Sequence, residues 1–191
     1  MKKEKILLRK KILDMREELT AFEVEQKSRI ILEKFLTLKQ LNTSSLIMSY
    51  VNFGKEVSTR ELLTSCISYN KRVAVPLVVN DCGRKELWAC EINDLQIDLE
   101  TGTFGILEPI KEKAKRINSW EIDIVVVPGV VFDTQRQRVG YGAGYYDRFL
   151  KEIRPDCFKV GIAYDIQIID NIPYEEHDVP LDLVITENRI I

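Results

Sequence analysis

The sequence has few of the residues that build disulfide frameworks and zinc sites. It contains four cysteines, none of them in a Cys-x-x-Cys pair, and one histidine, His177. A structural zinc site needs several such ligands at short spacings, and small disulfide-bonded domains are much richer in cysteine. We therefore expect free, buried thiols at Cys66, Cys82, Cys90 and Cys157.

The sequence also lacks long apolar runs and a strong excess of one charge. No apolar stretch approaches the ~18 residues of a membrane span. The basic start at residues 1–5 is not followed by the apolar segment of a signal peptide. The net charge of −2 disfavours a nucleic-acid-binding protein. These absences predict a cytoplasmic protein with no membrane or nucleic-acid partner. The sequence leaves the oligomeric state open, and a monomer is favoured.

The 191 residues predict one domain that spans residues 1–191. The first forty residues are expected to form two helices, the second opened by a capping box at Thr20 and Glu23. A similar capping box at Ser58 and Glu61 is expected to open a later helix. Strands are expected at residues 46–51, 72–79, 87–92, 122–127, 159–164 and 183–186, and a short helix at 145–151. Pro76 suggests that its strand is an edge strand or leaves the sheet early.

The order of these elements indicates the fold class. Residues 122–127 are apolar almost throughout, which is typical of a strand buried on both faces of a parallel sheet. Strands and helices mostly alternate after the helical start. The sequence therefore predicts an α/β three-layer sandwich with a largely parallel central sheet, preceded by an N-terminal helical segment.

Three alternating glycines follow the most apolar predicted strand. Residues 125–150 read VVVPGVVFDTQRQRVGYGAGYYDRFL, with Gly140, Gly142 and Gly144 placed directly before a predicted helix. Alternate glycines permit unusual backbone angles and let an anion approach main-chain amides at a helix start. The spacing is neither G-x-G-x-x-G nor a Walker A loop. Alone, the glycines fit a phosphate-binding loop or a tight structural turn.

The residues beside the glycines favour a nucleotide site. The guanidinium group of Arg138 can neutralise phosphate charge. Tyr145 and Tyr146 offer rings for a flat heterocycle, although core packing explains one of them equally well. Asp147 fits two roles, a magnesium ligand or a charge that stabilises the helix start.

A basic stripe on the first predicted helix has two interpretations. Lys5, Arg9 and Arg16 lie within about 40° of one another at ~100° per residue, beside an apolar stripe that contains Leu8 and Ile12. Such a stripe is usually a solvated face. It is also suited to phosphate binding if the fold brings it to the glycines.

These residues together resemble the 5-formyltetrahydrofolate cyclo-ligase family. The run from Arg138 to Arg148, R-x-G-x-G-x-G-Y-Y-D-R, is similar to the family signature, and the P-G-x-x-F-D run at residues 128–133 is similar to its lead-in. The resemblance extends over nearly the whole chain. Its other parts are Lys5-x-x-Leu8-Arg9, Glu56-Val57-x-Thr59, Phe104-Gly105-Ile106-x-Glu108-Pro109, His177-Asp178-x-Pro180-x-Asp182 and Thr186-Glu187.

The resemblance implies an ATP-dependent enzyme that closes a ring in 5-formyltetrahydrofolate. It implies two small-molecule substrates, ATP and the folate, and Mg²⁺ as cofactor. Implied ATP-binding residues are Lys5, Arg9, Arg138, Gly140, Tyr141, Gly142, Ala143, Gly144, Tyr145 and Tyr146. Implied folate-binding residues are Val51, Glu56 and Tyr145, implied metal ligands are Asp147 and Asp178, and implied catalytic residues are Arg138, Tyr145 and Asp147.

Ala143 departs from the family pattern, because some members have lysine at this position. A regulatory homologue that binds nucleotide or folate without turnover is therefore an alternative. A sugar-phosphate isomerase or acyl transferase is another, with Glu108 or Asp133 as its carboxylate. Nucleic-acid binding through the basic first helix is a third, which the net charge disfavours.

Overall fold

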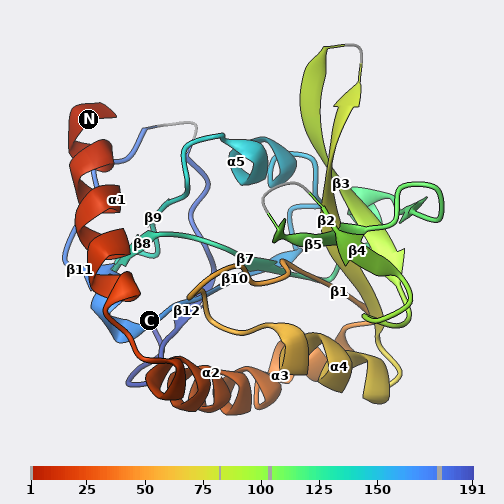
Figure 1. Cartoon of the computed structure of the whole chain (residues 1–191), viewed down its shortest axis with the longest axis horizontal. Coiled ribbons are helices and arrows are strands. Elements are labelled where there is room, and N and C mark those ends of the chain that lie inside the picture. The colour runs from red at the N-terminus through yellow and green to blue at the C-terminus, as the bar shows by residue number, and fades with distance from the viewer. Residues whose placement is uncertain (1, 82, 103–104, 176–177) are drawn as a thin grey trace.

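A seven-stranded sheet runs through the centre of the molecule, in the order β12-β10-β7-β1-β2-β3-β6 (Figure 1). The computed structural model describes residues 2–81, 83–102, 105–175 and 178–191. Its central strands are β1 (Leu46–Ser49), β2 (Arg72–Asp81), β3 (Arg84–Ile92), β6 (Lys115–Arg116), β7 (Ile124–Val127), β10 (Phe158–Ile162) and β12 (Leu183–Ile185). The pairings from β12 to β2 are parallel, and those of β3 with β2 and β6 are antiparallel. The largely parallel central sheet is confirmed.

Helices cover both faces of this sheet. Helices α2 (Ala21–Leu36), α3 (Lys39–Thr43) and α4 (Arg60–Ser68) lie below it in Figure 1, and α5 (Tyr145–Phe149) lies above. Successive residues of β7 point to opposite faces, so Ile124 and Val126 join the core under α2 and α4, while Val125 and Val127 join the core under α5. The strand is fully buried, as its unbroken apolar run predicts.

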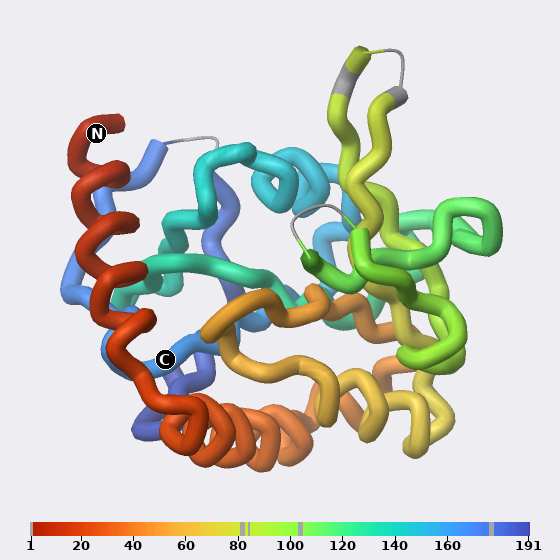
Figure 2. The backbone as a smooth tube through the Cα atoms, in the orientation of Figure 1, coloured from red at the N-terminus to blue at the C-terminus, as the bar shows by residue number. Residues whose placement is uncertain are grey.

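The first helix, α1 (Lys2–Glu17), lies at one end of the sheet rather than over a face (Figures 1 and 2). It packs on a small sheet of β8 (Val131–Asp133), β9 (Arg138–Val139) and β11 (Ile168–Ile169). Ile12 is buried there among Val130, Val131 and Val139. This contact fixes α1 against the chain that leads from β7 to the three glycines.

The remaining described elements are short. They are the paired strands β4 (Leu99–Thr101) and β5 (Leu107–Pro109) and two 3₁₀ helices, Ser119–Glu121 and Asp165–Gln167. Part of the expected loop-rich stretch before Trp120 is therefore a small antiparallel ribbon.

The direction of the connections reverses between β1 and β7. From β1 the chain moves to β2 on one side, and from β7 it moves through β10 to β12 on the other. Because β1 and β7 are parallel neighbours, with Ser49 opposite Val126, their carboxyl ends open at the same edge. Open α/β sheets bind ligands at such a switch point. The loop that carries Glu56 and the segment that carries the glycines both start there.

Some expected details of the elements are wrong. The capping box at Thr20 and Glu23 is present, but α4 begins after Thr59 without a side-chain cap, and the Ser58 amide donates to Ser28 Oγ instead. The helix expected to start after the glycines is present, and it ends at Phe149 after five residues.

Pro76 lies inside β2 rather than at an edge strand. Beyond Ala74, however, β2 pairs only with β3 among the described strands. Because no residue of β1 pairs with Pro76, its missing N–H costs no hydrogen bond to β1. Cys66, Cys90 and Cys157 are buried free thiols as expected, and burial raises the pKa of Cys66 to about 11. Cys82 lies outside the described residues.

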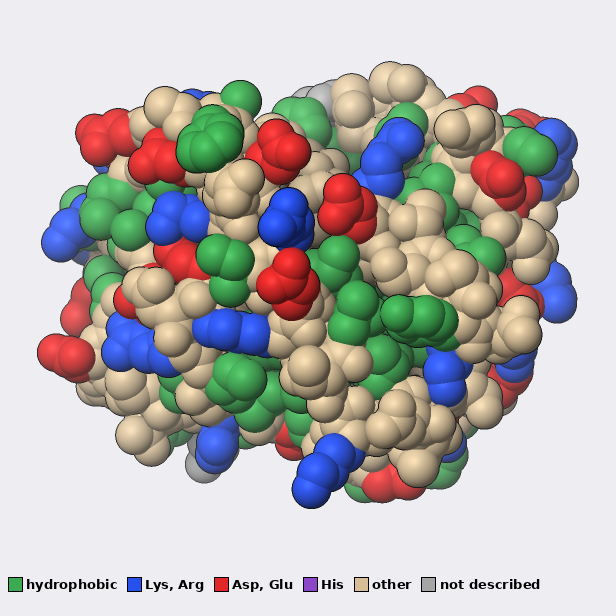
Figure 3. Space-filling view, turned by 90° about the horizontal axis from the view of Figure 1, so that it is seen from below, with side chains coloured by type: hydrophobic (Ala, Val, Ile, Leu, Met, Phe, Trp, Pro, Cys, Tyr) green, Lys and Arg blue, Asp and Glu red, His purple; other side chains and the backbone are tan. Residues whose placement is uncertain are grey.

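Figure 3 shows the face that α2, α3 and α4 cover, where acidic and basic side chains are interspersed. No large patch of one charge is visible on this face. In the described part of the chain, no helix is both long and apolar enough to cross a membrane.

Candidate active site

The residues that follow β7, as far as Asp133, stabilise the fold. Gly129 and Gly161 leave room for the ring of Phe132, which would lie 2.5 Å and 2.8 Å from a Cβ atom added at these positions. The Asp133 carboxylate accepts the amides of Gln135, Gln137 and Ile172 at 2.8–2.9 Å. Because these bonds occupy both oxygens of a fully buried carboxylate, Asp133 is unsuited to act as a base.

The three glycines of the loop, Gly140, Gly142 and Gly144, serve different purposes. A Cβ at Gly140 would lie 2.9 Å from a guanidinium nitrogen of Arg138, so this position must stay small. Gly142 has φ +106° and Gly144 has φ +67°, conformations that other residues rarely adopt. Gly144 is also the residue before α5. The tight turn is therefore real, and it is built around a buried arginine.

That arginine, Arg138, is 8% exposed and binds the first turn of α5. Its Nη2 donates to Asp147 Oδ1 at 2.6 Å, and its guanidinium carbon lies 5.9 Å from the centre of the Tyr146 ring. Burial lowers the pKa of Arg138, and the charges of Asp147 and Asp178 oppose this shift. The charges of both expected metal ligands thus favour the charged form of Arg138.

Two buried polar atoms beside this ion pair, Arg138 Nε and Tyr146 Oη, have no hydrogen-bond partner among the described residues. Burial raises the pKa of Tyr146, while Arg138 lowers it and Glu56 raises it further. Tyr146 therefore lies within the electrostatic reach of both Arg138 and Glu56. Buried polar groups without partners are uncommon, and a polar ligand at this place would satisfy them.

The basic residues of α1 make polar contacts within the protein, and Arg9 and Arg16 contact the glycine loop. Lys5 Nζ binds Asp178 Oδ2 at 2.6 Å, and Arg9 Nε donates to the Gly140 carbonyl at 2.6 Å. Arg16 is 5% exposed, and its Nη2 donates to the hydroxyl of Tyr141 at 2.9 Å. The interpretation of this stripe as a solvated face is therefore wrong for these three residues.

Glu56 lies at the centre of a separate buried network. Its Oε1 accepts the hydroxyl of Tyr141 at 2.5 Å, and its Oε2 accepts the Phe53 amide at 2.9 Å. The hydroxyl of Tyr164, which follows β10, donates to the Glu56 carbonyl at 3.0 Å. Burial raises the pKa of Glu56, and its hydrogen bonds to Tyr141 and Phe53 and the charge of Arg16 limit the rise.

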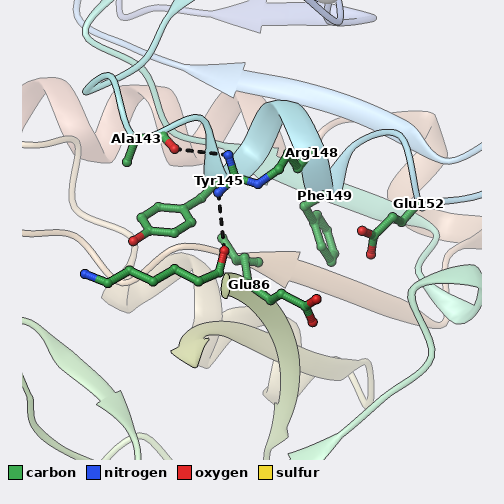
Figure 4. A pocket seen from close by; sticks show the side chains of 8 residues that line it. Glu86, Ala143, Tyr145, Arg148, Phe149 and Glu152 are labelled. Carbon is green, nitrogen blue, oxygen red and sulfur yellow. Dashed lines mark hydrogen bonds between the residues drawn. The ribbon is translucent and has the colours of Figure 1, made fainter. Parts of the chain in front are cut away.

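A pocket of about 520 Å³ lies between α5 and β3, on the other side of the glycine loop (Figure 4). Ala143, Tyr145 and Arg148 line one side of it, and Glu86 lines the other. Arg148 spans the pocket, since it donates to the carbonyls of Ala143 at 3.2 Å and Lys85 at 3.4 Å. Its guanidinium carbon lies 5.4 Å from the centre of the Tyr145 ring.

Most of the expected site residues meet around the glycine loop. Tyr145 and Ala143 open onto the pocket, whereas Lys5, Arg9, Arg138, Glu56 and Asp178 do not line it. Val51 follows β1 and packs half-buried against the core under α2 and α4.

The other matched motifs are placed as follows. Glu108 is on the β4–β5 ribbon, where the space at Gly102 accommodates it. Thr186 and Glu187 accept Lys34 Nζ through their carbonyls, which ties the end of the chain to α2. Phe104 and His177 lie outside the described residues.

A magnesium ion at this place would take most of its ligands from phosphate and water. The described residues contain no cluster of three His, Cys, Asp or Glu side chains arranged to hold a metal on their own. Magnesium needs only one or two carboxylates when phosphate oxygens and waters complete its shell. Asp147 pairs with Arg138 and Asp178 pairs with Lys5, so both carboxylates lie among cations that a phosphate would contact.

The sequence did not reveal the side-chain partners of Glu56. Tyr141 donates to its carboxylate and Tyr164 to its carbonyl, from 85 and 108 residues away in the chain, and Arg16 is linked to it through the Tyr141 hydroxyl. Arg16 was noted as part of the basic stripe, but no spacing connects it to a carboxylate so distant in sequence.

Replacing Gly142 with alanine should weaken nucleotide binding about tenfold. A side chain at this φ costs about 1–3 kcal/mol, and the loop would relax away from the observed conformation. Titration calorimetry with an ATP analogue would measure the loss. Gly83→Ala is the matched control, because Gly83 has φ +84° at the β2–β3 turn with open space around it. Equal losses in both variants would contradict a specific role for the loop.

Comparisons with known proteins place this fold and site. The model of the 5-formyltetrahydrofolate cyclo-ligase family matches residues 1–187. A 5-formyltetrahydrofolate cyclo-ligase from Haemophilus influenzae is 32% identical over 175 residues, 91% of this chain and 92% of the relative. A probable one from Schizosaccharomyces pombe is 36% identical over 105 residues, 49% of this chain and 52% of the relative.

Solved structures agree with these relatives. The structure of Aquifex aeolicus 5,10-methenyltetrahydrofolate synthetase has a TM-score of 0.84 and 32% identity, and covers 97% of this chain and 91% of its own. The structure of the 5,10-methenyltetrahydrofolate synthetase from Mycoplasma pneumoniae has a TM-score of 0.75 and 27% identity. The match covers 96% of this chain and 98% of the synthetase. Fold and site thus define an α/β enzyme of folate metabolism, a ligase. The chain belongs to the 5-formyltetrahydrofolate cyclo-ligase family.

Proposed function

We propose that this protein uses ATP to convert 5-formyltetrahydrofolate into 5,10-methenyltetrahydrofolate, releasing ADP and phosphate. The observation that carries the proposal is the meeting of two networks at the switch point between β1 and β7. One network is rich in cations and glycine, and the other is centred on the buried carboxylate of Glu56. The first suits a triphosphate and the second suits the N–H groups of a reduced pterin.

The phosphate side combines main-chain amides with three cations. Arg9 reaches the loop from α1 through the Gly140 carbonyl, Arg138 reaches it from β9, and Lys5 pairs with Asp178. Lys5 pairs with Asp178, and Arg138 pairs with Asp147. The two cations suit the phosphates of ATP, and the two carboxylates suit the counter-ion that accompanies them. Because α5 is short, the cations and loop amides must supply most of the stabilisation. Ala143 offers no charge here, so these three cations replace the lysine found in some relatives.

The folate side is built around Glu56. Its two bonded oxygens, held by Tyr141 and the Phe53 amide, fix the carboxylate in one orientation. Each oxygen keeps a lone pair for a donor on the substrate. Val51 contributes apolar surface, and Tyr145 offers an aromatic face to the part of the folate that would extend into the separate pocket of Figure 4.

The reaction divides into two steps. The formyl oxygen attacks the γ-phosphorus of ATP, an O–P bond forms, and ADP leaves. The neighbouring N10 amine then attacks the activated carbon, loses its proton, and expels phosphate as the C–O bond breaks. Neither step needs a nucleophile from the protein, which agrees with a site of arginine, glycine and carboxylates.

The protein's task is therefore to position and to stabilise charge. Arg138, buried beside the loop, offsets the negative charge that develops on the transferred phosphoryl group. Asp147 and Asp178 would hold Mg²⁺, which would neutralise phosphate charge when bound. The cytoplasmic location stays a prediction.

A turnover assay tests the proposal. Purified protein, ATP, magnesium and 5-formyltetrahydrofolate should form the methenyl product, seen by its absorbance, together with one ADP per product. Omitting ATP should abolish product formation. Binding of both substrates without turnover would instead favour the regulatory homologue. No binding of nucleotide, in a protein that still rearranges folate, would overturn the role of the loop.

A further inference from the structure

The side chain of Tyr141 joins the two halves of the site. Its main chain lies in the glycine loop, between Gly140 and Gly142, while its hydroxyl donates to Glu56 Oε1 at 2.5 Å. The same hydroxyl accepts Arg16 Nη2 at 2.9 Å. The residue is 51% exposed, so the hydrogen bonds of its hydroxyl contribute to holding the side chain in place. Burial of the hydroxyl and the charge of Glu56 raise the pKa of Tyr141, which keeps it a proton donor.

The backbone on both sides of Tyr141 belongs to the phosphate side. The Gly140 carbonyl accepts Arg9 Nε at 2.6 Å, and Gly142 turns the chain with φ +106°. A phosphate that binds the loop amides and Arg9 would fix Gly140, Tyr141 and Gly142. Tyr141, the middle one of these residues, holds the carboxylate of Glu56. The hydrogen bond between Tyr141 and Glu56 thus joins the proposed nucleotide site to the proposed folate site.

We propose that Tyr141 is a positioning residue that makes nucleotide binding at the glycine loop strengthen folate binding at Glu56. The inference rests on the proposed function, because it takes the loop as the nucleotide site and Glu56 as the folate site. A nucleotide bound to the loop would hold Tyr141 more firmly in its observed hydrogen bond, so the Glu56 carboxylate would lose less freedom when the folate binds. A ligand that binds an ordered site loses less conformational entropy on binding.

The coupling has a measurable size and works in both directions. Allosteric coupling between two ligands is typically 5–150-fold, and thermodynamic linkage makes it reciprocal. Because a single hydroxyl carries the contact, we expect a factor near the lower end, about 5–10-fold. Tyr141→Phe keeps the ring but removes the hydroxyl and should reduce the factor to about 1–2-fold.

Calorimetry on the full chain tests this directly. The affinity of 5-formyltetrahydrofolate is measured with and without saturating β,γ-imido ATP and magnesium, in the unchanged protein and in Tyr141→Phe. Tyr69→Phe removes an exposed hydroxyl at the end of α4 and serves as the matched control. Arg16→Lys keeps the charge but changes the directed N–H to Tyr141, and should lose part of the coupling.

The outcomes separate the inference from the proposed function. Coupling that survives in Tyr69→Phe and disappears in Tyr141→Phe supports the inference. Equal coupling in Tyr141→Phe and the unchanged protein overturns it, as does a factor of one in the unchanged protein, while the proposed function stands in both cases. Failure of either ligand to bind the unchanged protein would end the proposed function and the inference with it.

Discussion

Replacing Arg138 with alanine is expected to lower turnover about 10²–10³-fold. This is the usual loss when a buried donor that stabilises transition-state charge is removed. Arg138 is 8% exposed, reaches Asp147 at 2.6 Å, and has a free Nε beside the hydroxyl of Tyr146 among the described atoms. Steady-state kinetics with saturating folate would report the change, and most of it should be in the maximal rate rather than in the folate KM.

Arg154→Ala is the matched control for this experiment. Arg154 also pairs with an aspartate, Asp123, but it does so before β7, at the opposite edge of the sheet from the glycine loop. Its loss should affect stability and leave the rate nearly unchanged. Circular dichroism and thermal unfolding of both variants separate misfolding from lost chemistry. Near-normal turnover in folded Arg138→Ala would show that this arginine does not stabilise the transferred phosphoryl group.

Replacing Asp147 with asparagine should lower turnover at fixed magnesium about 10²-fold or more. The change removes one of two carboxylates available to a metal near Arg138 and leaves that buried cation without its closest counter-charge. If the carboxylate binds the metal, higher magnesium concentrations should recover part of the rate. If it serves only to stabilise the start of α5, they should not.

Asp182→Asn provides the comparison for Asp147. Asp182 accepts both the amide and the Nζ of Lys159 at 2.7 Å, just before β12, and so lies at the edge away from the loop. Its magnesium dependence should match that of the unchanged protein. An unshifted magnesium dependence in Asp147→Asn as well would remove Asp147 from the metal site and leave it the structural role.

The fold and the glycine loop could be predicted from sequence because their signals are local. The run of β7 is apolar on both faces, and the alternation of strands and helices indicated a parallel sheet. The loop can be recognised from consecutive residues, and Gly142 and Gly144 have the positive φ angles that favour glycine. The same local reasoning failed at Ser58, since tertiary packing directs its amide to Ser28 rather than to a helix cap.

The electrostatic network of the site could not be predicted because it is assembled across the sheet. Whether the stripe on α1 faces solvent or the loop depends on where α1 packs, which the small sheet of β8, β9 and β11 decides. Likewise, Tyr141 meets Glu56 only because β1 and β7 are neighbours. The pairing order of parallel strands is a global property, and no short motif in this chain encodes it.

The most direct measurement is a calorimetric titration of the purified protein with β,γ-imido ATP and magnesium, in the presence of 5-formyltetrahydrofolate. We expect a saturable one-to-one complex that Arg138→Ala weakens strongly and Arg154→Ala does not. A folded protein that binds the folate but gives no heat with nucleotide would contradict it, because the cations around the glycine loop would then have no triphosphate to hold.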